Sequence, residues 1–402
     1  MFAAPVKVVE NDLMTMTSPY LSGLYAPTDR ESTFDLEVLG ELPSDLNGTF
    51  ARVGSNPRFA PKGRYHWFDG DGMIHAVAFE NGSATYRNRY VHTEHFEKES
   101  EAGESLWTGI TERPDFTNPN GVWKDTANTD LVFHANRLLS MWWLCGRPHE
   151  IELPSLDTLG TVDFGDKRSE RISAHPKVDP RTGELIVFAY SPVPPYLSYG
   201  VVSADGTLAH WTEVDLHAPR LQHDIAITER HTVLFDMSMQ WDADLLARGQ
   251  TKVRFYRDTP SRIGVIPRFG AGSDVRWFEV EPMFMYHTIN AWEEGDILSL
   301  IGCRIADPLA NDPTNPTDTR TIPEIGFLRL APAVHRWDLN LATGAVRETQ
   351  LDDTLGEFPR MNNELLGCPT RYSYVPTFAP METLAFDGVM KHDLKTGTTQ
   401  RC

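Results

Sequence analysis

NGTFARVGSNPRFAPKGRYHWFDGDGMIHAV, the stretch from Asn47 to Val77, decides the fold class. It combines glycines and prolines, which favour turns, with aromatic side chains. Asp69-Gly70-Asp71-Gly72 predicts a tight turn, because glycine supplies the positive φ that hairpin turns require. Residues 73–78 then carry mostly apolar side chains on both alternating faces, which is typical of a strand buried on both sides. The stretch therefore predicts β-hairpins packed deep in an all-β protein.

Composition limits the possible partners. The chain has 402 residues, of which 41% are apolar and 23% charged, as in a globular protein with a sizeable core. Its formal net charge is -19. Because an acidic surface repels phosphate backbones, nucleic acid is not expected as a partner.

Cysteines and terminal segments bear on location. The four cysteines, Cys145, Cys303, Cys368 and Cys402, contain no CxxC pair, so neither a disulfide framework nor a zinc ribbon is indicated. The N-terminal residues lack a basic segment followed by an apolar one, so we expect no signal peptide. No apolar run reaches the roughly 18 residues that a membrane-spanning helix needs. We therefore expect a cytoplasmic protein.

Turn signals recur along the chain with short apolar runs between them. Residues 1–45 predict an N-terminal arm, and residues 46–402 a single domain. Strand–turn–strand patterns occur at residues 129–144, 179–190 and 201–208. Their spacing favours the blades of a β-propeller, in which one repeat spans roughly 40 to 50 residues.

Two segments depart from this rhythm. Residues 99–126 are polar and predict a long loop, whereas residues 241–248 (WDADLLAR) are the best candidate for a helix. We therefore predict an all-β propeller with few short helices in its loops.

Histidine supplies the candidate chemistry. The sequence contains no HExxH, GxSxG, GxGxxG or Walker motif, which removes common hydrolase and nucleotide-binding interpretations. His175, His223 and His287 each stand at or near the end of an apolar β pattern, in different repeats. Strand ends near the axis of a propeller converge, so the three could share a metal ion such as Fe, Zn, Cu or Ni. Tyr196 and Tyr286 lie near these strands and could line a tunnel or pack in the core.

A family resemblance rests on motifs that occur in order. The opening stretch, with Asn56-Pro57 and residues 65–75 (YHWFDGDGMIH), resembles the signature of the carotenoid cleavage oxygenases. The further matching motifs are Ala127-Asn128-Thr129, Ala174-His175-Pro176-Lys177, His223-Asp224, Pro267-Arg268, Trp277-Phe278, residues 287–293 (HTINAWE) and Glu357-Phe358-Pro359-Arg360.

The resemblance implies a seven-bladed propeller with an axial Fe(II) held by four histidines. His175, His223 and His287 match the first three ligands, and Glu357 matches a carboxylate that accepts the other imidazole N–H. We expect the fourth histidine beyond Cys402, which would leave the last blade truncated. Residues 139–146 (LSMWWLCG) also differ from the family, which often has an acidic residue where this chain has Trp142, Trp143 and Leu144.

Three functions stay open at this point. The resemblance implies a dioxygenase that uses O2 to cleave an alkene double bond of a carotenoid or apocarotenoid into two carbonyl products. A stilbene-type dioxygenase is the close alternative, so the expected substrate is an apolar polyene or a stilbenoid. The third is a catalytically inactive propeller that binds an apolar ligand. Transient membrane contact is also expected, because polyenes partition into lipid.

Overall fold

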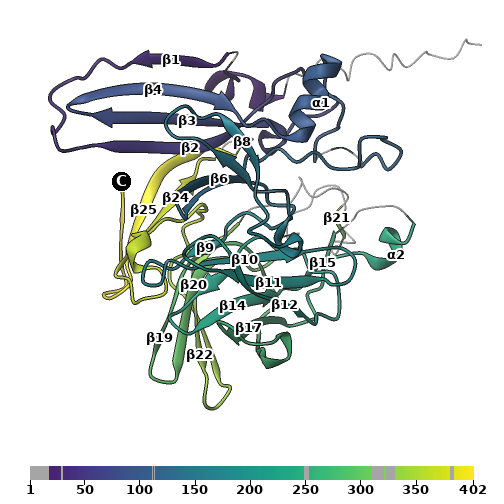
Figure 1. Cartoon of the computed structure of the whole chain (residues 1–402). Coiled ribbons are helices and arrows are strands. Elements are labelled where there is room, and N and C mark those ends of the chain that lie inside the picture. Colours follow the sequence, from purple (N-terminus) through teal and green to yellow (C-terminus); the bar gives the residue numbers. More distant parts are fainter. Residues whose placement is uncertain are drawn as a thin grey trace, which may run out of the picture.

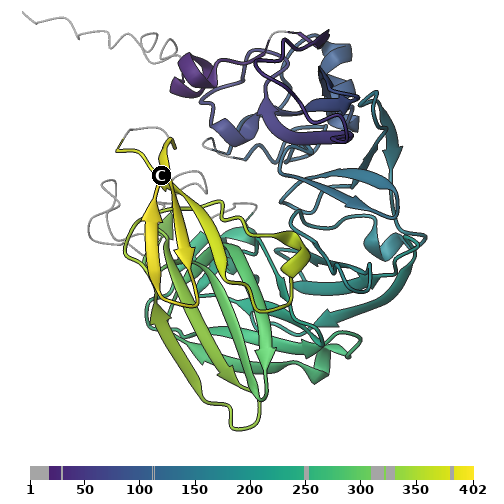
Figure 2. The same ribbon diagram turned by 90° about the vertical axis from the view of Figure 1, so that its left-hand side faces the viewer.

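The computed structural model describes residues 18–28, 30–110, 112, 114–248, 253–308, 321–322, 331–380 and 384–402. Six antiparallel sheets, which we call the first to sixth blades, follow one another around a common axis (Figures 1 and 2). The predicted all-β propeller is thus confirmed, whereas the seventh blade stays a prediction.

The strands of each blade are consecutive or nearly so in the chain. The first blade contains β1 (Ser32–Asp35), β2 (Gly48–Asn56), β3 (Asp71–Glu80) and β4 (Ser83–Tyr90). The second contains β5 (Asp130–His134), β6 (Arg137–Met141), β7 (His149–Ile151) and β8 (Thr158–Thr161). The third contains β9 (Lys177–Val178), β10 (Leu185–Tyr190), β11 (Leu197–Val202) and β12 (Leu208–Val214).

The remaining blades follow the same plan. The fourth contains β13 (Ala226–Ile227), β14 (His231–Asp236), β17 (Ser261–Pro267) and β18 (Arg276–Val280). The fifth contains β19 (Phe284–Glu294), β20 (Ile297–Ile305), β22 (Ala333–Asn340) and β23 (Val346–Gln350). The sixth contains β24 (Tyr372–Phe378), β25 (Phe386–Asp393) and β26 (Thr398–Arg401). A separate small sheet contains β15 (Met239–Trp241), β16 (Val253–Phe255) and β21 (Thr321–Ile322).

The hydrophobic core is divided among the interfaces between neighbouring blades. Five clusters of buried apolar side chains lie between successive blades, from the first and second to the fifth and sixth. Phe188 and Tyr199 of the third blade, for example, share a cluster with Leu234 and Ile266 of the fourth. Alternating apolar positions on both faces of each sheet make this stacking possible.

The DGDG sequence does not form the predicted turn. The connection from β2 to β3 runs over residues 57–70, and neither Gly70 nor Gly72 has a positive φ. The two glycines instead allow close packing. A Cβ on Gly70 would lie 2.7 Å from Asn56 N, and one on Gly72 would lie 2.6 Å from Ala127 O. The prediction of a hairpin turn was therefore wrong, since these glycines serve contacts with distant parts of the chain.

Helices are few, as predicted. α2 (Ala243–Leu246) falls within the segment predicted to be helical. α1 (Glu94–Ala102) overlaps the start of the predicted long loop at residues 99–126, so that boundary was wrong. Thr93 caps its N-terminus by accepting a hydrogen bond from Phe96 N, and Gly103 ends it with a φ of 73°. These local caps stabilise a helix whose largely charged sequence gives little hydrophobic periodicity. No helix in the described ranges is long and apolar enough to cross a membrane.

Part of the predicted arm belongs to the propeller. Within residues 1–45, β1 pairs with β4 at the outer edge of the first blade. Two 3-10 turns, η1 (Pro19–Leu21) and η2 (Gly23–Tyr25), join opposite ends of the described ring. Tyr25 Oη donates to Leu384 O at 2.5 Å, and Leu384 N donates to Tyr20 Oη at 2.7 Å. Both tyrosine rings also pack against Trp67 near the first blade. The domain boundary at residue 45 stays a prediction.

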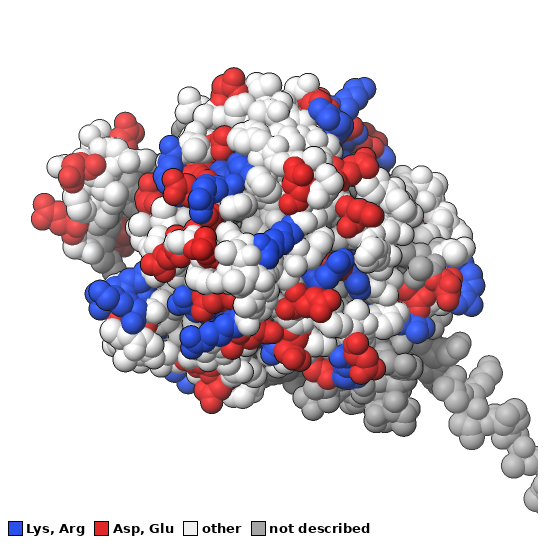
Figure 3. Space-filling view, turned by 90° about the horizontal axis from the view of Figure 1, so that it is seen from below, with Lys and Arg blue, Asp and Glu red and all other residues white. Residues whose placement is uncertain are grey.

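Charges of both signs are interspersed over the face shown in Figure 3. The expectation that nucleic acid is not a partner rests on the net charge of -19 and stays a prediction.

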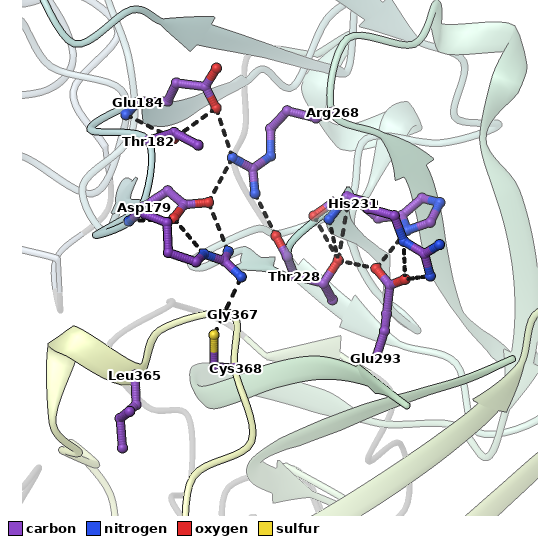
Figure 4. Close-up of polar contacts among 12 residues, drawn as sticks. Asp179, Thr182, Glu184, Thr228, His231, Arg268, Glu293, Leu365, Gly367 and Cys368 are labelled. Atoms are coloured by element: carbon purple, nitrogen blue, oxygen red, sulfur yellow. Dashed lines mark hydrogen bonds and ion pairs between the residues drawn. The ribbon is translucent and has the colours of Figure 1, made fainter. Parts of the chain in front are cut away.

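A polar network ties the third, fourth and fifth blades together (Figure 4). Arg268 donates to Asp179 Oδ2 at 3.0 Å and Glu184 Oε2 at 2.9 Å, and also to Thr228 O. Thr228 Oγ1 in turn donates to Glu293, which accepts a further bond from His231. Asp179, Thr228 and Glu293 lie at the ends of β9, β13 and β19. The three histidines described below lie near the opposite ends of these same strands.

This network predicts a loss of stability in acid. Burial alone would raise the pKa of Glu293, but hydrogen bonds from His231, Thr228 and Arg230 lower it from 4.5 to about 2. Its stabilising contribution is therefore present above pH 4.5 and lost as the pH falls towards 2. At about 1.4 kcal/mol per pKa unit, reduced by solvent screening of the exposed Arg230, we expect a loss of about 1 to 2 kcal/mol between pH 7 and pH 3. Urea unfolding at pH 7 and pH 3 of the native chain and of Glu293→Gln measures it. Exposed Glu229→Gln is the control, and equal pH slopes for the native chain and Glu293→Gln would contradict the assignment.

Candidate metal centre

Three histidines from three blades meet at the propeller axis. His175 lies two residues before β9, His223 three residues before β13, and His287 within β19. The ring centroid of His175 lies 4.8 Å from that of His223 and 4.9 Å from that of His287. The centroids of His223 and His287 are 4.9 Å apart. One ring nitrogen of each lies within 4.8 Å of the other two. Residues far apart in sequence are thus brought within reach of one ion.

Local backbone irregularities direct two of these side chains. His175 has a φ of 65°, which L-residues rarely adopt. The pairing of β19 with β20 shifts register between Met285 and Thr288, which indicates a bulge at His287. Bulges and left-handed residues are often found where a side chain must point in a direction that regular strands do not allow.

Carboxylates fix the tautomers of two rings. Asp130 Oδ2 lies 3.2 Å from His175 Nδ1, and Glu357 Oε2 lies 2.5 Å from His287 Nδ1. Because an ionised carboxylate only accepts hydrogen bonds, each Nδ1 carries the proton and each Nε2 keeps its lone pair. His175 Nε2 is buried and has no hydrogen-bond partner among the described residues. A buried nitrogen of this kind is what a metal ligand provides.

The surroundings of His223 are aromatic. Its ring centroid lies 6.0 Å from that of Trp143 and 5.0 Å from that of Tyr286. Its Nδ1 is buried and has no hydrogen-bond partner among the described residues. Burial lowers the pKa of His223 well below its ordinary value, and repulsion by His175 and His287 lowers it further, so the imidazole is neutral.

The arrangement fits a transition metal. Neutral imidazoles bind Fe, Zn, Cu and Ni, and two carboxylates here orient their rings. A cavity that none of the three histidines lines reaches Trp143, whose ring contacts that of His223. Its lining combines aromatic and charged side chains: Phe59, Tyr65, Phe68, Trp107, Trp123, Trp142 and Trp143 on the one hand, and Lys62, Arg64, Asp69, Asp71, Glu99 and Lys124 on the other.

The other predicted site residues divide into two groups. Glu357 lies beside His287, and Tyr286 contacts His223. Tyr196 instead packs at the edge of the cluster between the third and fourth blades, and its tunnel role stays a prediction. His392, the last histidine of the sequence, lies 3.3 Å from Asp352 Oδ2 and is not part of the histidine cluster.

Two residues at the centre were not predicted. Asp130 directly follows the Ala127-Asn128-Thr129 motif, so its position in the sequence could have indicated a role. Phe358, whose φ is 58°, packs against His287 with a centroid separation of 5.2 Å. It belongs to the same motif as Glu357, and its backbone N–H donates to that carboxylate.

Unlike His175 and His287, His223 has no carboxylate partner among the described residues, and a substitution at Trp143 tests the effect of adding one. We expect Trp143→Glu to place a carboxylate near His223 Nδ1 and to tighten Co(II) binding about tenfold, the lower end of the effect of such partners. Anaerobic titration followed by absorption spectroscopy measures the affinity. Trp142→Glu is the control, because among the ring contacts described Trp142 has none with His223. Equal affinities for Trp143→Glu and the native chain would refute the expectation.

Comparisons with known proteins agree with this geometry. A family model described as retinal pigment epithelial membrane protein matches residues 25–402. The carotenoid 9,10(9',10')-cleavage dioxygenase 1 of Phaseolus vulgaris is 33% identical over 401 residues, which cover 93% of this chain and 72% of the relative. Isoeugenol monooxygenase of Pseudomonas putida is 31% identical over 379 residues, covering 91% and 77%.

A solved structure extends the likeness to three dimensions. The lignostilbene dioxygenase of Pseudomonas brassicacearum has a TM-score of 0.83 and 31% identity, over 96% of this chain and 83% of that chain. Family match, sequence identity and fold agree, and the chain therefore belongs to the carotenoid cleavage oxygenase family, that of the retinal pigment epithelial membrane protein.

Proposed function

We propose that this chain is a non-haem Fe(II)-dependent dioxygenase that cleaves an alkene double bond of a carotenoid or apocarotenoid with O2. Both oxygen atoms enter the products, so that one C=C bond is replaced by two C=O groups. The observation that carries the proposal is the cluster of His175, His223 and His287, whose nitrogens lie within 4.8 Å of one another.

The residues of the chain have defined parts in this proposal. Bound iron would supply the chemistry that activates O2, which no side chain provides. The three imidazoles hold the ion, while Asp130 and Glu357 keep the protons of His175 and His287 on Nδ1. The aromatic side chains around the cluster, Trp143, Tyr286 and Phe358, exclude water and present an apolar wall to the substrate.

The relatives support a carotenoid as the first choice of substrate. Carotenoid 9,10(9',10')-cleavage dioxygenases of several plants are 33–34% identical to this chain. The aromatic side chains that contact the cluster, Trp143, Tyr286 and Phe358, agree with an apolar substrate. The predicted seventh blade, fourth histidine, cytoplasmic location and transient membrane contact are part of the same proposal.

A stilbenoid is the second candidate. It is favoured by the fold likeness to a lignostilbene dioxygenase at a TM-score of 0.83 and by the identity to isoeugenol monooxygenase. Both alkenes would be cleaved at the same histidine cluster, so the substrate and not the centre distinguishes the two functions.

One experiment tests both candidates. Fe(II)-loaded protein is incubated with an apocarotenal and, separately, with a hydroxystilbene under ¹⁸O2, and aldehyde products are identified by mass spectrometry. Labelled aldehydes from the apocarotenal are the expected result. Products from the stilbene alone favour the second candidate. No product from either, with iron bound, would favour the inactive ligand-binding propeller and refute the enzyme.

A further inference from the structure

Asp224 connects the three chain segments that carry the histidines. It is 3% exposed and directly follows His223. Its Oδ1 lies 2.6 Å from Lys177 Nζ, and its Oδ2 accepts hydrogen bonds of 2.8 Å from Thr288 N and from Thr288 Oγ1. Lys177 stands two residues after His175, and Thr288 directly follows His287.

These contacts cross two blade boundaries at the level of the metal centre. The clusters between these blades are made of apolar side chains, which slide more easily than hydrogen-bonded groups because dispersion has no direction. The polar network around Arg268 lies at the opposite ends of the inner strands, so Asp224 makes the polar contacts at the level of the histidines. The bond from Thr288 N attaches Asp224 to the backbone of β19, beside the bulge at His287. The ion pair with Lys177 attaches it to β9 of the third blade.

The carboxylate of Asp224 is buried with partners on both oxygens, the Lys177 ammonium at Oδ1 and the two Thr288 donors at Oδ2. A charge buried with its partners satisfied resists displacement, because any movement leaves it or a donor unpaired.

We propose that Asp224 is a positioning residue of the metal centre, which sets the spacing of His175, His223 and His287 through its contacts with Lys177 and Thr288. This role rests on the proposed function, because it presumes that the three histidines bind a metal ion. A site of this kind has to be held to within about 0.5 Å, and a group that touches all three ligand-bearing segments achieves this directly.

Asp236 provides a matched control. It is also a buried carboxylate, on β14, and forms ion pairs with Arg220 and Arg262. None of these partners is among the histidine cluster or the residues beside it. A purely structural effect of losing a buried charge should therefore be similar for Asp224→Asn and Asp236→Asn.

The test is anaerobic titration of the full-length native chain and both variants with Co(II), followed by its visible absorption bands. Affinity and band positions report the ligand geometry without any catalytic activity. We expect Asp224→Asn to bind Co(II) 10- to 100-fold more weakly, with shifted bands. Asp236→Asn should be less stable to urea and yet match the native affinity and spectrum.

Other outcomes decide against the role. Native affinity and spectrum for Asp224→Asn would overturn it. If Asp224→Asn does not fold, two variants take its place: Lys177→Met removes the ammonium at Oδ1, and Thr288→Val removes the hydroxyl donor at Oδ2 but keeps the backbone donor. Native Co(II) binding by both would equally overturn the role. If the native chain binds no Co(II), both the proposed function and the role of Asp224 are overturned. If the native chain binds Co(II) and Asp224→Asn binds it as well as the native chain does, only the role of Asp224 is overturned.

Discussion

Metal binding by the variant His287→Ala is expected to be weaker by roughly 10²- to 10³-fold, with loss of alkene cleavage. This estimate divides the free energy of metal binding at a four-ligand site, roughly 10 to 16 kcal/mol, equally among the four ligands. His287 is the most informative of the three histidines, because its removal also leaves Glu357 without its ring partner. Glu357 is 1% exposed, so the variant should lose folding stability as well. Metal content after dialysis and anaerobic titration measure the affinity.

His149→Ala separates the two effects. His149 is buried like His223 but lies on β7 of the second blade, and its Nδ1 has no partner among the described residues. It is not one of the three clustered histidines, so its removal should leave metal binding unchanged. Native affinity in His287→Ala, or an equal loss in both variants, would show that the cluster is not the binding site.

The second large effect is expected for Glu357→Gln. The carboxylate accepts a 2.5 Å hydrogen bond from His287 Nδ1 and another from Phe358 N. A carboxamide keeps one neutral acceptor but loses the charge that fixes the tautomer and raises the basicity of Nε2. We expect metal affinity to fall 10- to 100-fold and the rate of cleavage to fall with it.

Glu348→Gln is the matched control for Glu357→Gln. Glu348 also lies near a histidine, at 3.8 Å from His335 Nε2, but on β23 at the outer edge of the fifth blade. Its replacement should change neither metal affinity nor turnover. The proposed contribution of Glu357 would be refuted if the two variants bound metal equally well.

The fold could be predicted where the signals are local. The hairpin of β5 and β6 follows from alternating side chains around Ala135-Asn136, both of which have the positive φ of a tight turn. The glycines of DGDG were misread because the contacts that require them, with Asn56 and Ala127, depend on the folded chain. α1 was missed because its sequence has no apolar stripe, and the contacts that hold it, of Phe96 with Tyr90 and of Glu99 with Lys124, depend on the folded chain.

The centre was predicted less completely. Histidines at strand ends, together with the family motifs, were enough to single out His175, His223 and His287. Their partners could not be derived in the same way, because Asp130 is 45 residues from His175 and Asp224 is 64 residues from Thr288. Convergence on the axis joins them, and a sequence pattern does not specify which carboxylate reaches which ring.

The contact between η2 and Leu384 has a consequence for synthesis in the cell. Tyr25 and Leu384 are 359 residues apart in the chain. At the usual speed of a ribosome, roughly 20 to 70 s pass between their emergence, if about 5 to 20 residues are added each second. During this interval the early blades can stack in order while Tyr20 and Tyr25 have no acceptor or donor at Leu384. The hydrogen bonds of Tyr20 and Tyr25 with Leu384 are therefore among the last contacts of the described chain to form.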